Sequence, residues 1–263
     1  MRFSIQAKPA ATALTAAIIA FAPLQAVHAA EASRFWAIGG IPESQLLRIE
    51  VEWYDQVKVT VRNIGPIGHR SCLPLTFSLD GRMLTVCATE ETGVQRLVLV
   101  DPQTGSGSMF GEPITGLNVM GMELAPDGKL YAFGDSNAQS PTYNSLFTIN
   151  PDTGRTTRIG STEVQGFFMD LAFDADARMW ATNVNALFRV DPSTGKATKV
   201  IDYLGASNIM GLSFAADGWT LFASDFRAAP NGSGLYYLDY ENGFLFPLAR
   251  LGPNLHSLLI DKR

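Results

Sequence analysis

Apolar and polar residues alternate in short runs along most of the chain, and residues typical of turns separate these runs. One phrase recurs, Leu-x-Phe-x-x-Asp-Gly followed by a second apolar run, and its copies begin at Leu75, Met122 and Leu212. A weaker copy begins at Leu171 and a truncated copy at Leu258. The Gly supplies the positive φ that a tight hairpin turn needs. Each copy therefore predicts two short antiparallel strands.

A second phrase alternates with the first and reads Leu-aromatic-x-Ile/Val-Asp-Pro-x-Thr-Gly. Its copies begin at Leu97, Leu146 and Leu187, a degenerate copy begins at Leu235, and Leu46 keeps only the apolar pattern. An apolar run followed by a Pro/Gly turn predicts a third strand that turns into a fourth. Each repeat unit, 41 to 49 residues long, is therefore expected to hold four strands.

A single four-stranded sheet of this size cannot bury its apolar faces, whereas several sheets stacked around an axis can. Four strands in a period of 40 to 50 residues are typical of a β-propeller. First-strand motifs occur five times, and second-strand motifs also occur five times, starting at residues 35–38. We therefore expect an all-β, five-bladed β-propeller with four strands per blade. One blade is expected to close by pairing the C-terminal segment 256–261 with the N-terminal segment 34–38.

The two phrases resemble those of exported bacterial propeller repeats of the NHL, YVTN and quinoprotein-dehydrogenase-like group. The resemblance covers about residues 35–263 and rests on the Asp-Gly hairpin and the Asp-Pro-x-Thr-Gly turn. It implies the propeller fold. Members of this group include lactonases, lyases and binding scaffolds, so the resemblance leaves the activity to be decided by the site.

Composition excludes two classes of protein. The chain has 263 residues, of which 46% are apolar and 17% charged, and this content is too hydrophobic for intrinsic disorder. Its formal net charge of −5 would repel a phosphate backbone, so nucleic acid is not expected as a partner.

The N-terminal segment predicts export. Arg2 and Lys8 precede an apolar run over 10–24 that is too short to span a membrane comfortably, and small residues before Ala29 fit a cleavage site. We expect a signal peptide over residues 1–29, cleavage after Ala29 or Ala30, and a single domain over 30–263. The alternative is an uncleaved N-terminal anchor. No later segment predicts a transmembrane span, so the expected location is periplasmic or secreted.

Two cysteines, Cys72 and Cys87, lie on either side of one predicted hairpin turn. Antiparallel pairing about that turn would place them opposite each other to within one residue, which favours a disulfide in an oxidising compartment. The alternative is two buried thiols. A metal site has little support, because Cys-x-x-Cys is absent.

Candidate ligand-binding residues fall on the loops that join strands 2 and 3 of a blade, and strand 4 to the next strand 1. These loops share one face of a propeller, and they vary in length and composition. Asn118, Asn208 and Asn254 all stand four residues before a first-strand Leu or Met. They are expected to surround the mouth of the central channel, either as a polar ring that binds a ligand or as caps of the loop backbone.

Asp135, Asn183 and Asp225 form a second aligned set, each just past its second strand. They could start turns, or could bind hydroxyl groups or a cation such as Ca²⁺. Arg227 follows in the last of these loops, and His256 stands beside Asn254 as either a packing residue or a general base.

The sequence contains no recognised motif for nucleophilic, zinc-dependent, nucleotide-dependent or haem chemistry. We therefore expect an exported binding or interaction module of unknown ligand, whose partner is a small molecule or an envelope protein. The alternative is a metal-dependent hydrolase or lactonase with its site at the mouth of the channel. Its cofactor would be Ca²⁺ or another divalent cation.

Overall fold

The computed structural model describes residues 33–40, 42–53, 57–134, 143–226, 232–251 and 254–261. These residues form twenty β-strands and no α-helix, as the repeats predicted. Within the described ranges there is accordingly no helix with the length and apolarity needed to cross a membrane. The predicted signal peptide, Asp135 and Arg227 lie outside the described residues.

Three repeat units form separate four-stranded antiparallel sheets, each in a simple up-and-down order. Their strands are β8 (Val119–Leu124), β9 (Leu130–Gly134), β10 (Ser145–Ile149) and β11 (Thr156–Ser161); β12 (Asp170–Phe173), β13 (Met179–Thr182), β14 (Ala186–Val190) and β15 (Ala197–Asp202); and β16 (Ile209–Phe214), β17 (Leu221–Asp225), β18 (Gly234–Asp239) and β19 (Phe244–Arg250).

The remaining eight strands belong to one larger sheet, in the order β20-β1-β2-β3-β5-β6-β7 with β4 paired to β5. They are β1 (Ser33–Gly39), β2 (Glu43–Trp53), β3 (Val57–Arg70), β4 (Leu75–Phe77), β5 (Met83–Ala88), β6 (Val94–Val100), β7 (Gly107–Thr115) and β20 (Leu255–Ile260). The two halves, β20 to β3 and β4 to β7, are joined through a single residue pair, Arg70 with Ala88.

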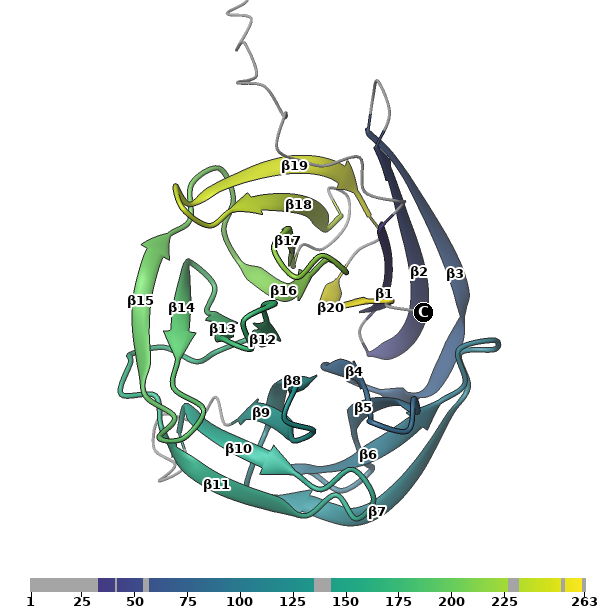
Figure 1. Cartoon of the computed structure of the whole chain (residues 1–263). Coiled ribbons are helices and arrows are strands. Elements are labelled where there is room, and N and C mark those ends of the chain that lie inside the picture. The colour runs from purple at the N-terminus through teal and green to yellow at the C-terminus, as the bar shows by residue number, and fades with distance from the viewer. Residues whose placement is uncertain are drawn as a thin grey trace, which may run out of the picture.

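The last strand of the chain pairs with the first. β20 and β1 are antiparallel, with Phe35 opposite Ile260 and Ala37 opposite Leu258. The predicted pairing of the two ends of the chain is thus confirmed. Figure 1 shows the sheets around a common axis, with β4, β8, β12, β16 and β20 nearest to it. Each of these inner strands contacts the next, and β20 contacts β4, so the ring is closed.

Five hydrophobic clusters hold the sheets together, each between two neighbouring groups of strands. Phe35 of β1 meets Phe222 of β17 with ring centroids 4.8 Å apart, and Phe133 of β9 lies 4.8 Å from Phe168. Burying such a ring stabilises the fold by roughly 1.5–3 kcal/mol. The core of this protein therefore lies between the sheets, and every sheet depends on its two neighbours.

Aspartates of the repeated turns bond their own backbone. Asp101 accepts a hydrogen bond from the Gln103 N–H at 2.8 Å, and Asp191 accepts one from the Ser193 N–H at 2.8 Å. This is the Asx-turn geometry expected of turn formers. The aspartates of these turns thus stabilise the local backbone.

The predicted disulfide between Cys72 and Cys87 is present, and both cysteines are buried. Cys72 precedes β4 and Cys87 lies in β5, with Cα atoms 4.0 Å apart. The bridge therefore fastens the segment that enters β4 to the end of β5.

Replacing both cysteines, Cys72→Ala with Cys87→Ala, should lower the free energy of unfolding by about 3 kcal/mol, the entropy expected for a loop of this length. Urea unfolding measures the change. Reductant should lower the stability of the parent protein toward that of the variant and leave the variant unaffected. Equal stability of parent and variant would contradict the structure.

Candidate functional site

The aligned asparagines lie where the inner strands begin. Asn208 and Asn254 have positive φ, 63° and 57°, a conformation that Asn tolerates better than most residues. The Asn208 side-chain amide donates to the Phe226 carbonyl at 2.7 Å, and the Phe226 N–H donates back to the Asn208 carbonyl at 2.9 Å. The Asn254 carbonyl accepts from the Gly40 N–H. These contacts give both residues a part in holding the loops.

Asn118 is exposed and differs from its two counterparts. Its side-chain oxygen accepts from the Gln95 amide at 3.1 Å, and its amide nitrogen lies 3.3 Å from the Met120 sulfur. Gln95 in turn accepts from the Val119 N–H at 2.7 Å. The Asn118 amide therefore lies at the loop face, where contacts with Gln95 and Met120 hold it.

Asn183 and Asp225 both bond local backbone. The Asn183 side-chain oxygen accepts from the Ala186 N–H at 2.8 Å. Asp225 is fully buried, and its carboxylate accepts from the Gly234 N–H and, at 2.8 Å, from the Tyr236 hydroxyl. Asp225 thus joins β17 to β18 across their connection.

His256 is one of several side chains in the described residues with buried polar atoms that lack a hydrogen-bond partner, and it is the one with two such atoms. Its side chain is 4% exposed, and among the described residues neither ring nitrogen forms a hydrogen bond. Burial lowers its pKa from 6.5 to about 4, so the imidazole is neutral near pH 7. Its ring lies 5.1 Å from that of Phe226, in the connection after β17. His256 therefore sits at the loop face of the ring, close to the axis.

The inner strands approach one another closely just below this level. A Cβ placed on Gly121 would lie 2.6 Å from the Asp170 Cα atom, so only glycine fits there. The Asp170 carboxylate accepts from the Leu171 and Leu212 N–H groups, each at 2.9 Å. Burial, with the nearby Glu123 charge, raises the Asp170 pKa well above its usual value. Asp170 therefore links β12 to β16.

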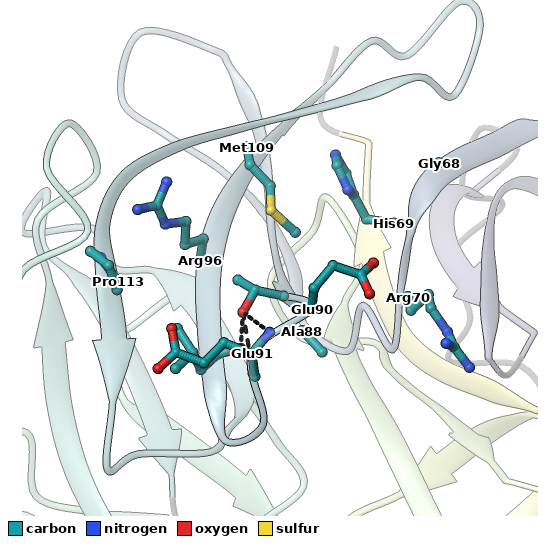
Figure 2. A pocket seen from close by; sticks show the side chains of 11 residues that line it. Gly68, His69, Arg70, Ala88, Glu90, Glu91, Arg96, Met109 and Pro113 are labelled. Carbon is teal, nitrogen blue, oxygen red and sulfur yellow. Dashed lines mark hydrogen bonds between the residues drawn. The ribbon is translucent and has the colours of Figure 1, made fainter.

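A cleft of about 510 Å³ opens on the same loop face, where the two halves of the larger sheet meet. In Figure 2, His69 and Arg70 from β3 form one wall, and Arg96, Met109 and Pro113 from β6 and β7 form the other. The Glu90 carboxylate lies between them, and the Glu91 carboxylate lies on the side of Arg96 and Pro113; both residues belong to the connection from β5 to β6. Cys72 follows Arg70 by two residues, and Cys87 precedes Glu90 by three. The disulfide therefore ties the end of β3 to the connection that carries Glu90 and Glu91.

The charged side chains of this cleft are not paired with one another. Among the described residues, Arg70, Arg96, Glu90 and Glu91 form no ion pair. The loop is held instead by Thr89, whose hydroxyl donates to the Val94 carbonyl at 3.2 Å and accepts from the Glu91 N–H at 3.2 Å. Positively and negatively charged side chains thus line one cavity, and hydrogen bonds hold the backbone of its loop.

A larger cleft, about 780 Å³, lies beside β1 to β3, and three of its four charged side chains, Arg48, Glu50 and Asp261, form ion pairs. Arg48 forms an ion pair with Asp261 at 2.5 Å, and its guanidinium stacks 4.3 Å from the Trp36 ring centroid. Both partners are largely buried. These contacts fasten β2 to the residue that follows β20. The two paired charges are therefore less available to a ligand.

The cleft lies on the face that carries the loops between strands 2 and 3, from which the sequence interpretation drew its candidates, but that interpretation did not select the acids of the cleft. Glu90 and Glu91 follow a second strand, as Asp135 and Asn183 do, so aligning every connection of this kind would have included them. It also overlooked that Met120, Met169 and Met210 share the aligned position of His256.

Several solved structures have a similar fold. They include a chain of a nidogen/laminin complex (TM-score 0.51, 14% identity, 88% of this chain and 98% of that chain) and a putative gluconolactonase (TM-score 0.51, 16% identity, 87% and 84%). The fold is a β-propeller. TolB from Acinetobacter baumannii also matches, with a TM-score of 0.49 and 14% identity, over 87% of this chain and 66% of that chain. No protein-family model and no curated protein sequence matches the chain.

These neighbours confirm the predicted β-propeller fold. At these identities the likeness extends to the fold alone. What the propeller of this chain binds must therefore be inferred from its own side chains.

The buried imidazole predicts a pH dependence of stability. Below pH 6.5 the unfolded chain protonates His256 while the folded chain does not, so stability should fall as the pH drops from 6.5 to about 4. Between pH 7.5 and pH 5 the unfolded chain gains this proton over about 1.5 pH units, which corresponds to about 2 kcal/mol. The variant His256→Phe should lose this contribution, and His69→Phe, at the cleft wall, serves as the matched control. Urea unfolding at pH 7.5 and pH 5 measures the difference; the same pH slope in His256→Phe and the parent would refute it.

Proposed function

We propose that the chain is an exported five-bladed β-propeller that binds a ligand carrying both positive and negative charge in the cleft between β3 and β6. The blade count treats the eight-stranded sheet as two blades. Its halves share one residue pair, and they enclose a hydrophobic cluster in which Trp36 and Leu46 of one half meet Leu75 and Val98 of the other. Strands that pack face to face in this way belong to neighbouring blades.

Export is supported by two features of the chain. The N-terminal segment has the pattern of a signal peptide, and the Cys72–Cys87 disulfide forms and persists in oxidising compartments. A periplasmic or secreted location agrees with both.

The observation that carries the binding function is a set of charges of both signs around one cavity, none of which forms an ion pair within the described part of the chain. Arg70 and Arg96 suit a carboxylate, and Glu90 and Glu91 suit an ammonium or guanidinium group. A volume of about 510 Å³ accommodates a small zwitterion or a few residues of a peptide. The partner is then a small molecule of the amino-acid type or a mixed-charge segment of an envelope protein.

The alternative, a metal-dependent hydrolase or lactonase at the axis with Ca²⁺ or another divalent cation, stays a prediction and fits the fold equally well. The aligned polar residues support a metal site at the axis less well than the charged side chains of the cleft support ligand binding. The side chains of Asn183, Asn208 and Asp225 are each bonded to protein backbone in the described residues. We therefore place the working site in the cleft.

The proposal is tested by measuring whether free amino acids and mixed-charge dipeptides bind. Saturation-transfer NMR detects the probes that bind, and calorimetry then measures their affinity. Each charge-assisted bond contributes about 1.5–3 kcal/mol, so Arg96→Glu or Glu90→Lys should weaken the binding of a hit about tenfold or more. Arg250→Glu, on the exposed outer strand β19, is the matched control and should leave affinity unchanged. A set of probes that do not bind, or that bind Arg96→Glu and parent equally, would refute the proposed ligand class.

A further inference from the structure

Four repeats carry a sulfur or imidazole side chain at one equivalent position, in an inner strand or directly before it. The position lies two residues before the first-strand Leu or Met of each repeat, and it holds Met120, Met169, Met210 and His256. The fifth repeat has Leu73 there. Because the inner strands contact one another in a closed ring, we expect equivalent positions of the repeats at a common level around the axis.

Three of the four positions interrupt the regular pairing of their strands. The register of β8 with β9 shifts between Val119 and Gly121, which leaves Met120 unpaired. β16 shifts in the same way around Met210, and the pairing of β20 with β1 shifts around His256. A bulge re-aims a side chain out of the alternation of the strand, and bulges are frequent beside functional sites.

The three methionines also differ from the others in what they pack against. Met83, Met122 and Met179 belong to the hydrophobic clusters between the sheets, and Met109 packs against one of them. Among the described residues, Met120, Met169 and Met210 belong to none of these clusters. Met169 is nevertheless only 3% exposed.

His256 supplies an independent observation. A buried imidazole whose two nitrogens have no partner is costly, and native structures rarely keep one without a reason. A bound cation would satisfy one nitrogen of this ring.

We propose that Met120, Met169, Met210 and His256 form a binding site for a soft monovalent cation, Cu(I), at the loop-face end of the axis. Thioether sulfur and neutral imidazole are ligands that favour copper, whereas Ca²⁺ and Mg²⁺ require oxygen ligands. The Asn118 amide, 3.3 Å from the Met120 sulfur, lies at the entrance. The site is separate from the charged cleft and does not depend on the function proposed for it.

The two cysteines do not supply an alternative thiolate site, because both are joined in the disulfide. The Cys72→Ala, Cys87→Ala variant should therefore keep the full capacity for Cu(I). This control separates binding at the axis from binding by adventitious thiols.

Anaerobic titration of the untagged full chain with Cu(I), against a chromogenic Cu(I) chelator, tests the proposal. We expect one Cu(I) per chain, with sulfur and nitrogen neighbours in its X-ray absorption spectrum. The triple variant Met120→Leu, Met169→Leu, Met210→Leu should bind at least a hundredfold more weakly, and Met179→Leu, in a hydrophobic cluster between two sheets, should bind as the parent does.

Leucine is close to methionine in volume, so the variants should fold, and circular dichroism with thermal unfolding checks this. If the triple variant fails to fold, the half-exposed single variants Met120→Leu and Met210→Leu should each still weaken binding about tenfold, and His256→Phe should remove the nitrogen neighbour from the spectrum. Failure of the parent to take Cu(I) from the chelator would overturn the proposal. Equal binding by parent and folded methionine variants would overturn it as well.

Discussion

Each four-stranded sheet of this chain has two apolar faces, and burying both requires a neighbour on either side. Phe222 of β17 is fully buried because Phe35 of β1 covers it, and Phe133 of β9 is buried against Phe168. This requirement can be met for every sheet only if the sheets form a closed ring. The pairing of β20 with β1 provides that closure, since it joins the end of the chain to its beginning.

The closed ring determines where chemistry can occur. The inner strands approach so closely at Gly121 and Gly211 that no side chain fits at these two positions. Candidate ligand-binding side chains therefore lie beyond them, where bulges and loops begin, or at the outer seams between sheets. The copper-binding proposal uses the first place and the charged cleft uses the second. Both sites therefore rest on a backbone that packing fixes in advance, which lowers the entropic cost of binding.

The repeats made much of the fold predictable from the sequence. The Asp-Gly and Asp-Pro-x-Thr-Gly phrases located the strands, and the two incomplete motifs at the chain ends predicted their pairing. The disulfide followed from one hairpin, because Cys72 and Cys87 flank the same turn. These features depend on local sequence or on the count of repeats, and both are visible without coordinates.

The sites were harder to predict, because they depend on which segments different sheets bring together. Arg70 and Glu90 belong to different sheet halves, and they share a cleft through the single pair that joins those halves. Asp225 could have been a ligand by its position, yet Tyr236 and Gly234 use its carboxylate. That no described residue forms a hydrogen bond with the His256 ring could not be foreseen from a pattern of strands, since it depends on the packing around the imidazole.

Native-state amide hydrogen exchange tests ring closure most directly. If β20 completes the ring, amides paired between β1 and β20, at Ala37 and Leu258 for example, should exchange only through global unfolding. Their free energy of exchange should equal that of the inner strands β8 and β12. Exchange of β20 at a much lower free energy, with β8 and β12 still protected, would show that the last strand is an accessory and would contradict the account.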